Sequence, residues 1–407
     1  MTSSRVTADG ASRRRNRRSR FVSLAVGVGL AASTALLTVG TAGASDFGAH
    51  FDGHHDQRAT GYTYVNDNTA TANTIAGFQR NADGSLTPLP GSPFNAGGAG
   101  NGAGLASQGA IQATSDGRYL VAVDAGSNQI SVLRVTEDGV PVLVGDPISS
   151  GGINPVSVAI SPTGLVYVAN SGAGGSGYSG FRLHDDGKLT PIPHSTVTVP
   201  DGSGVGDVFF NAPGDHLVGT RTGTSLIDSF VVRPNGRLLA ADGSPFSGQG
   251  LGQLGAEFSP TNPGQLFVSN AHNGAGLGTV SAYNDGSSGQ LNSIGSSPYA
   301  DGQTAPCWVE ISHDGKYLFT VNTGSGNVSS YAINGDGSLA LVGSTSISGG
   351  GADLDARLSP DGKYLLVDGA GHNFVSVFAV NGGNLTELAS SPTALPTGAH
   401  SSGIVNI

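Results

Sequence analysis

Cysteine is almost absent from this chain. Cys307 is the single cysteine among 407 residues, so no disulfide can form within the chain. Its neighbours, Pro306 and Trp308, carry no positive charge that would stabilise a thiolate. We therefore interpret Cys307 as a buried structural thiol rather than a nucleophile, and we expect the hydrophobic core to hold the fold together.

Positive charge is also scarce. Seven of the 19 basic residues and one of the 29 acidic residues lie in residues 1–44, which leaves 12 basic and 28 acidic residues, a formal charge of −16, in residues 45–407. A surface of this sign repels nucleic acid and anionic lipid. We expect neither as a partner.

The first 44 residues read as an export signal. Six arginines between Arg13 and Arg20 precede an apolar, uncharged stretch from Phe21 to Gly40, and Ala42-Gly43-Ala44 is a small-x-small cleavage site. A membrane anchor is the alternative, because about 20 apolar residues can span a bilayer. The cleavage site favours removal of this segment. We then expect a secreted chain that begins at Ser45 and does not insert stably into a membrane. Export could follow the general secretory route. The twin-arginine route is the alternative, because Arg17-Arg18-Ser19-Arg20-Phe21 is close to a twin-arginine signal.

A repeat of about 50 residues follows a polar lead-in at 45–60. Its clearest element is a turn between two apolar runs, as in Ser115-Asp116-Gly117 and Ser359-Pro360-Asp361-Gly362. Pro presets φ for such a turn, Asp bonds its own backbone, and Gly takes a positive φ. The turn glycines are 47, 50, 50, 51 and 47 residues apart: Gly117, Gly164, Gly214, Gly264, Gly315 and Gly362.

The repeat predicts four strands per unit and seven units. Six copies are complete, but the first, from Tyr62 to Leu89, lacks its first strand. The missing strand is available in Ser402–Ile407, so the two ends should share one blade and leave no exposed sheet edge there. We therefore predict an all-β chain with a single domain at 61–407. The predicted domain is a seven-bladed β-propeller of four-stranded antiparallel blades, its first blade closed by the C-terminal strand.

These repeats resemble the lactonase family of seven-bladed propellers, which includes 6-phosphogluconolactonases and carboxymuconate cyclases. The resemblance covers roughly residues 61–407 and rests on Ser359–Leu365 with its copies, and on Tyr331–Asn334 followed by Asp336–Leu339. It implies hydrolysis or formation of a lactone without a metal, by His, Arg and Glu side chains on one propeller face.

The chain departs from that family at the catalytic positions. Family enzymes carry an Arg-His pair after a Pro in a late blade and a Glu after the second strand of that blade. Here Pro306 is followed by Cys307-Trp308, and Thr323 follows Asn322. An earlier stretch that is rich in His in the enzymes is Ser203–Asp207 here. The family's residues therefore do not transfer one by one.

Candidate site residues converge on the face where each first strand begins and each second strand ends. His272, His372 and His400 are candidate bases there, and Arg221 is a candidate carboxylate binder. Each could equally be a solvated or loop-holding residue. Further candidates for ligand binding at the starts of first strands are Asp207, Trp308 and Asp355.

A second set of polar residues recurs two places before each turn. The repeats carry Gln112, Ala159, Phe209, Glu257, Glu310 and Arg357 at this position. Equivalent strand positions should point the same way and form a ring around the axis. We predict that Arg357 pairs with Glu310, either as a structural clasp or, with Glu257, as a polar floor for a ligand.

Two functions remain open from the sequence. One is a secreted hydrolase or cyclase that acts on a small lactone or carboxylate. The other is a non-catalytic propeller that binds a glycan, a peptide or a small ligand. The histidines lack metal-ligand spacing, and the Asp-Gly turns are not calcium loops, so we expect no metal and no cofactor. We expect a monomer whose partner is a small molecule or a carbohydrate.

Overall fold

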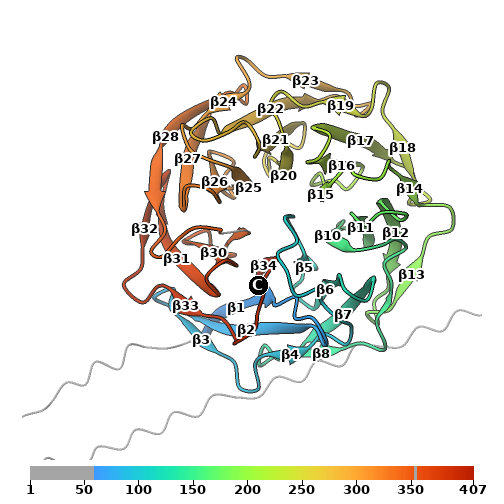
Figure 1. The fold of residues 1–407 in the computed structure, drawn as a ribbon, viewed down its shortest axis with the longest axis vertical. Helices are drawn as coiled ribbons and strands as arrows, with labels where there is room; N and C mark the ends of the chain where they lie inside the picture. Colours follow the sequence, from blue (N-terminus) through green and yellow to red (C-terminus); the bar gives the residue numbers. More distant parts are fainter. Residues whose placement is uncertain (1–58, 353–354) are drawn as a thin grey trace, which may run out of the picture. The chain divides into compact units, whose positions relative to one another are not determined.

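Seven antiparallel sheets stand in a ring around a central channel (Figure 1). The computed structural model describes residues 59–352 and 355–407, so the predicted signal segment and most of the lead-in lie outside the described residues. Ala59 and Thr60 already belong to the strand expected to start at Tyr62, so this strand starts three residues earlier than expected. The seven-bladed propeller with antiparallel blades is confirmed.

Each blade runs from an inner strand at the channel to an outer strand at the rim. In blade order, the first strands are β34 (Ile404–Asn406), β5 (Ile111–Ala113), β10 (Pro155–Ile160), β15 (Val205–Phe210), β20 (Gln253–Phe258), β25 (Pro306–Ile311) and β29 (Ala356–Leu358). The second strands are β1 (Ala59–Asn66), β6 (Tyr119–Asp124), β11 (Leu165–Asn170), β16 (His216–Arg221), β21 (Gln265–Asn270), β26 (Tyr317–Asn322) and β30 (Tyr364–Gly369). The third strands are β2 (Thr74–Asn81), β7 (Gln129–Val135), β12 (Gly177–Leu183), β17 (Leu226–Val232), β22 (Thr279–Asp285), β27 (Asn327–Ile333) and β31 (Phe374–Asn381).

The outermost strand is divided in most blades. In six blades it consists of two short pieces that both pair with the third strand: β3 (Leu86–Pro88) with β4 (Phe94–Asn95), β8 (Pro141–Leu143) with β9 (Ile148–Ser149), β13 (Leu189–Pro191) with β14 (Val197–Thr198), β18 (Leu238–Ala240) with β19 (Phe246–Ser247), β23 (Leu291–Ser293) with β24 (Tyr299–Ala300), and β32 (Asn384–Glu387) with β33 (Thr393–Ala394). A proline such as Pro93 or Pro245 lies between the two pieces, and proline cannot donate a ladder hydrogen bond. Only β28 (Leu339–Ser346) of the sixth blade has no proline inside it, and it is continuous.

The repeated turn behaves as predicted in five of its six copies. Gly117, Gly164, Gly214, Gly315 and Gly362 have φ between +68° and +75°. Gly264 lacks a positive φ, which corrects the prediction for that copy. Two extra residues there move the closing hydrogen bond to the Gln265 amide, which donates to the Asn262 carbonyl over 2.8 Å. We call the propeller face that holds these turns the turn face, and the opposite one the loop face.

The C-terminal strand closes the ring as predicted. β34 pairs antiparallel with β1, with Tyr64 opposite Val405 and Val65 opposite Ile404. The amide of Tyr62 donates to the carbonyl of Ile407 over 2.9 Å, and the reciprocal bond is also 2.9 Å. Ile404 and Val405 are buried, so this strand contributes core as well as hydrogen bonds.

Side chains at the start of several second strands fasten one blade to the next. The hydroxyl of Tyr119 donates to the Asp185 carbonyl over 2.8 Å, and that of Tyr364 donates to the Ala82 carbonyl over 3.2 Å. Each acceptor lies at the Asp-Gly turn of the following blade, where the glycine leaves room for the ring. His216 takes the tyrosine's place in the fourth blade and contacts Asp285 of the fifth over 2.5 Å. Within residues 59–352 and 355–407 there is no helix with the length and apolar character needed to cross a membrane.

Candidate ligand site in the central channel

The first strands carry the predicted ring into the channel. Gln112, Ala159, Phe209 and Glu257 line one cavity of about 270 Å³. Gln112 and Arg357 line a second cavity of about 740 Å³, which also reaches Asn406 at the chain end. Because Gln112 and Ala113 line both cavities, the two adjoin at the channel mouth on the turn face.

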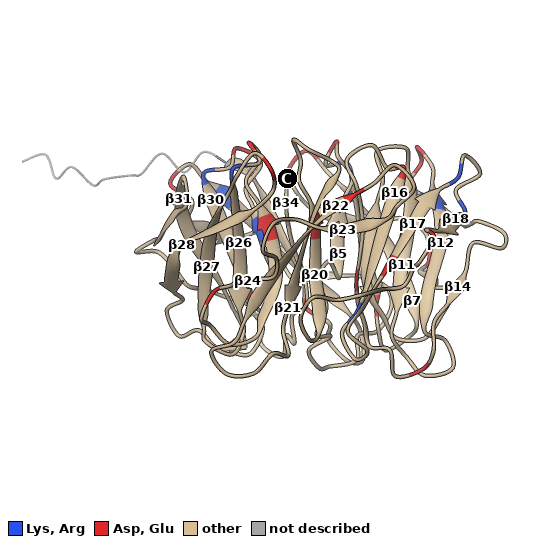
Figure 2. Cartoon of the chain, turned by 90° about the horizontal axis from the view of Figure 1, so that it is seen from above, with Lys and Arg blue, Asp and Glu red and all other residues tan. Residues whose placement is uncertain are grey.

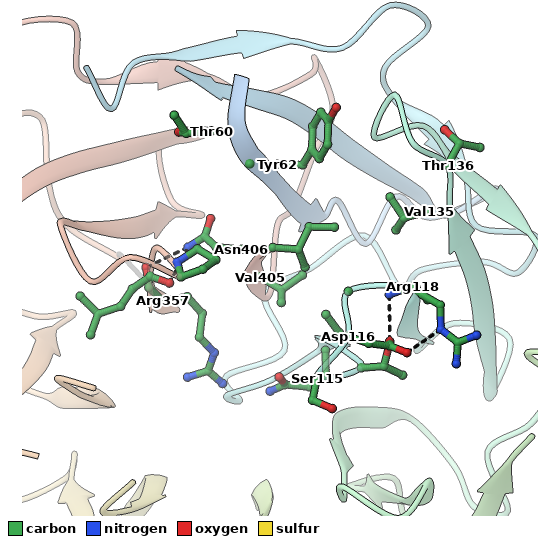
Figure 3. Close-up of a pocket in the computed structure, with 18 of the residues that line it drawn as sticks. Thr60, Tyr62, Ser115, Asp116, Arg118, Val135, Thr136, Arg357, Val405 and Asn406 are labelled. Atoms are coloured by element: carbon green, nitrogen blue, oxygen red, sulfur yellow. Dashed lines mark hydrogen bonds and ion pairs between the residues drawn. The ribbon is translucent and has the colours of Figure 1, made fainter. Parts of the chain in front are cut away.

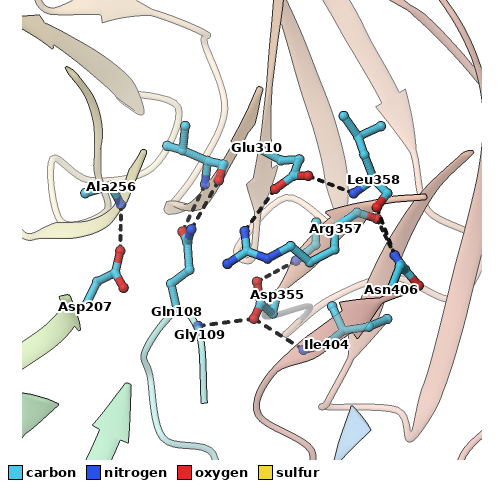
Figure 4. Close-up of polar contacts among 12 residues, drawn as sticks. Gln108, Gly109, Asp207, Ala256, Glu310, Asp355, Arg357, Leu358, Ile404 and Asn406 are labelled. Atoms are coloured by element: carbon cyan, nitrogen blue, oxygen red, sulfur yellow. Dashed lines mark hydrogen bonds and ion pairs between the residues drawn. The ribbon is translucent and has the colours of Figure 1, made fainter. Parts of the chain in front are cut away.

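Arg357 and Glu310 form the predicted ion pair at the floor of this mouth (Figure 4). Nη1 of Arg357 donates to Oε2 of Glu310 over 2.9 Å, and Oε1 accepts the Leu358 amide over 2.8 Å. The two side chains are only 11% and 8% exposed. Burial alone would lower the pKa of Arg357, but the charges of Asp355, Glu310 and Glu257 raise it. The guanidinium therefore stays charged.

One nitrogen of this guanidinium is left over. Nη2 of Arg357 is buried and has no hydrogen-bond partner. Figure 3 shows the side chain reaching into the larger cavity. A buried donor without a partner costs free energy that an oxygen atom of a ligand could recover.

Glu257 supplies the complementary group. Burial, reinforced by the nearby Glu310 charge, holds the pKa of Glu257 well above its usual value, although Arg357 opposes the shift. Its Oε2 atom has no hydrogen-bond partner. Burial therefore favours the protonated form of Glu257, and its side chain lines the smaller cavity.

Asp207 and Asp355 lie deeper and join neighbouring blades. Asp207 accepts the hydroxyl of Ser157 and the amide of Ala256, both over 3.0 Å, and burial raises its pKa to about 7. Asp355 accepts amides of Gly109 over 3.2 Å and Ile404 over 3.3 Å, and burial raises its pKa to about 6. All of these contacts link separate blades, so both carboxyls hold different blades together.

Gln108 closes the channel below this floor. The side-chain amide of Gln108 exchanges two hydrogen bonds of 3.2 Å with the backbone of Val309. The backbone amide of Gln108 donates to the Gly206 carbonyl over 3.1 Å. Figures 1 and 4 show this segment before β5 crossing the middle of the ring. The two cavities therefore open on the turn face, above this crossing.

The residues expected on the loop face lie apart from these cavities. Arg221 is held by Asp228 through Nε at 2.6 Å and Nη2 at 2.5 Å, and Tyr178 donates to the same carboxylate over 2.8 Å. This placement supports the interpretation in which Arg221 holds its hairpin together. Three exposed loop residues, none of which lines either cavity, are His272, His372 and His400.

Trp308 and Cys307 belong to the core. Trp308 is 1% exposed, and its indole nitrogen has no hydrogen-bond partner. Burial raises the pKa of the Cys307 thiol to about 11, against the opposing effect of Thr323. The pair that replaces the family's Arg-His therefore packs between blades instead of facing a ligand. Among the described residues there is also no cluster of His, Cys, Asp or Glu suited to hold a metal ion.

Sequence reasoning missed the side chains at the rim of the larger cavity. His313 lines it from the turn of the sixth blade, Thr114 from the turn of the second, and Asn406 from the closing strand. Asn406 donates to the carbonyls of Arg357 and Leu358 over 3.0 and 3.2 Å. One feature of the sequence pointed to this rim. The position two residues before each turn carries Glu257, Glu310 and Arg357 in three repeats, so the neighbouring turns should lie at the same mouth.

Fold and channel together define a lactonase-type seven-bladed propeller. The family model described as lactonase, 7-bladed β-propeller, matches residues 58–210 and 258–399, and the chain belongs to that family. No curated protein shows a significant match.

Solved structures share the fold at low sequence identity. A candidate 6-phosphogluconolactonase from Bacteroides uniformis is 21% identical with a TM-score of 0.70, covering 87% of this chain and 100% of its own. A similar protein from Bacteroides fragilis is 21% identical with a TM-score of 0.69, covering 85% and 98%. The periplasmic gluconolactonase of Pseudomonas aeruginosa is 19% identical with a TM-score of 0.68, covering 85% and 99%.

Proposed function

We propose that this protein is a secreted lactonase that hydrolyses, or in reverse forms, a small lactone at the turn-face mouth of its channel, without a metal. The observation that carries the proposal is the pair of unpartnered polar atoms at this mouth, Arg357 Nη2 and Glu257 Oε2. The two residues line adjoining cavities of about 740 and 270 Å³, and the larger one has the size of an ordinary small-molecule site. The names of the similar structures point to the same chemistry.

The chemistry needs three roles. Water attacks the lactone carbonyl carbon, the ring C–O bond breaks, and the ring oxygen leaves as a hydroxyl. The guanidinium of Arg357 would stabilise the developing oxyanion, and protonated Glu257 would give its proton to the ring oxygen. The rim histidine, His313, would take the proton from the attacking water, since a neutral imidazole is a base near pH 7.

A lactone panel tests this proposal. Purified protein should hydrolyse a small lactone faster than the spontaneous rate, and Glu257→Gln should lower kcat/KM by about 10²-fold or more if Glu257 is the general acid. Arg221→Ala and alanine variants of His272, His372 and His400 test the loop-face residues in parallel. Loss of turnover in these four variants, with Glu257→Gln fully active, would move the site to the loop face.

A binding protein without turnover is the second candidate. The observation that favours it is the burial of Cys307 and Trp308 at the positions where family enzymes carry an Arg-His pair. In that case the panel gives no rate above background, while calorimetry still detects a ligand whose affinity falls in Arg357→Met.

Secretion is part of the proposal and rests on residues 1–44. Their basic, apolar and small-x-small order supports cleavage before Ser45. N-terminal sequencing of protein from culture medium should begin near Ser45, and folded cytoplasmic protein beginning at Met1 would contradict it.

A further inference from the structure

We infer that the channel site takes an uncharged, polyhydroxylated lactone and discriminates against its phosphorylated form. The inference rests on the proposed function and concerns its substrate. Its basis is the way in which charge is distributed over the two adjoining cavities.

Every cation at the site is already paired with a carboxylate. Among the described residues that line the two cavities, the fixed cations are Arg118 and Arg357. Arg118 contacts Asp116 over 2.5 Å, and Arg357 contacts Glu310 over 2.9 Å. Glu137 lines the larger cavity as well, so three carboxylates, Asp116, Glu137 and Glu310, accompany the two cations. Glu257 is not counted, because burial favours its neutral form.

The surroundings of Arg357 oppose a further anion. The charges of Asp355 and Glu310 both act on its guanidinium and raise its pKa. A phosphate monoester is close to a dianion above its second pKa of about 6. It would meet several carboxyls and one cation that is already neutralised, whereas phosphate sites normally offer free cations or several converging amides.

The remaining lining suits hydroxyl groups. Arg357 Nη2 can donate to an uncharged oxygen, and the carboxyl of Glu257, whose protonated form burial favours, can then both donate and accept. The larger cavity adds uncharged hydroxyl and amide side chains at Thr60, Gln112, Thr114, Ser115, Thr136 and Asn406. These groups match the hydroxyls of a sugar lactone without needing any net charge on it.

The direct test compares one lactone with and without its phosphate. Initial rates with D-glucono-1,5-lactone and its 6-phosphate, corrected for spontaneous hydrolysis, give two values of kcat/KM at low salt and pH 7.5. We expect the uncharged lactone to be preferred by at least tenfold, and the preference to shrink in about 0.5 M salt because screening weakens repulsion. Equal values, or a preference for the phosphate, would overturn the inference.

A charge variant isolates the cause. Gln112 lines both cavities, so Gln112→Lys places a new cation at the junction. We expect it to raise the relative kcat/KM for the phosphorylated lactone by about tenfold, while Gln112→Met, which has a similar length and no charge, keeps the wild-type ratio. An equal shift in both variants would show that charge does not set the preference.

A binding arm separates this inference from the proposed function. If neither lactone is hydrolysed, the proposed lactonase fails. Calorimetric titration with D-glucose and D-glucose 6-phosphate then decides the specificity. Tighter binding of D-glucose upholds the inference, and tighter binding of the phosphate, or no binding of either, refutes it.

Discussion

A single guanidinium organises the floor of the channel. Arg357 is the one cation among Glu257, Glu310 and Asp355, contributed by three consecutive blades. Buried ion pairs of this kind are weak sources of net stability, because desolvation offsets much of the attraction. Removing one partner is a different matter, because the remaining charge stays buried without compensation.

A double-mutant cycle measures this coupling. Arg357→Met should lower the free energy of unfolding by about 3–5 kcal/mol, because Glu310 and Asp355 lose their counter-charge. Glu310→Gln added to Arg357→Met should recover part of that loss, since a neutral amide no longer needs the guanidinium. Urea unfolding gives all four free energies, and simple additivity would mean that the two side chains do not interact. Lys363→Met, at an exposed pair with Asp361, is the control and should change little.

Residues on repeated strand positions could be predicted from the sequence, and loop residues could not. Glu310 and Arg357 occupy the same place in two copies of one repeat, so strand geometry alone puts them side by side. Arg221 has no such repeat partner, and nothing in the sequence reveals that Asp228 and Tyr178 occupy its guanidinium. The position of Gln108 across the channel depends on contacts with residues about 200 positions away, and local pattern cannot show this.

Strands close the ring where the chain begins and ends. The sequence predicted this element because the first repeat lacked a strand and residues 402–407 were available to supply it. It did not predict the divided outer strands, since their short second pieces lie beyond a proline and carry only two residues each. A sequence pattern is visible only in longer regular runs of residues. These two-residue pieces form strands because they pair with the third strand, which the local sequence does not reveal.

Truncation tests the closing strand. Deleting residues 402–407 removes the buried side chains of Ile404 and Val405 and the ladder with β1. Each side chain is worth about 1.5–3 kcal/mol of burial, so the truncated chain should lose at least about 3–6 kcal/mol and melt at a clearly lower temperature. Ile404→Val, which removes one methylene at the same place, should cost only about 0.5–1.5 kcal/mol. An unchanged melting temperature on truncation would contradict the closure.

The whole molecule keeps its charges in two very different settings. Most Lys, Arg, Asp and Glu lie toward the face that holds the C-terminus, which is the turn face (Figure 2). There, exposed carboxylates accept hydrogen bonds from residues of their own turn. In Asp116 these bonds, first of all the one from Thr114, lower the pKa to about 2. For the buried carboxyls the opposite holds. Burial raises the pKa of Asp67 and Asp207 to about 7, of Asp124 and Asp355 to about 6, and those of Asp368 and Glu257 well above their usual values.

These buried carboxyls set the sign of the pH dependence. A carboxyl whose pKa is higher in the folded state than in the unfolded chain holds its proton more tightly when folded. Its contribution to stability is complete below the unfolded pKa of about 4 and is lost as the pH rises through about 6 to 7. His216, whose pKa is raised mainly by its hydrogen bond to Asp285, acts in the same direction, and its contribution is present below about 6.5 and is lost above its raised value. The exposed turn carboxyls, such as Asp116 and Asp314, have lowered pKa values. Their contribution to stability is lost only in stronger acid, as the pH falls through these pKa values.

The protein should therefore be most stable in mild acid and should lose stability between pH 5 and pH 8. We expect melting temperatures to fall by roughly 5 °C or more over this range, which corresponds to a few kcal/mol for a domain of this size. Asp67→Asn should flatten the slope, because it removes a carboxyl that titrates near pH 7 and whose buried Oδ1 has no hydrogen-bond partner. Asp116→Asn removes an exposed carboxyl that stays ionised throughout this range, so its slope should equal that of the wild type. Calorimetric scans at each pH decide the matter: a melting temperature that rises from pH 5 to pH 8, or equal slopes in Asp67→Asn and wild type, would contradict the raised pKa values of the buried carboxyls.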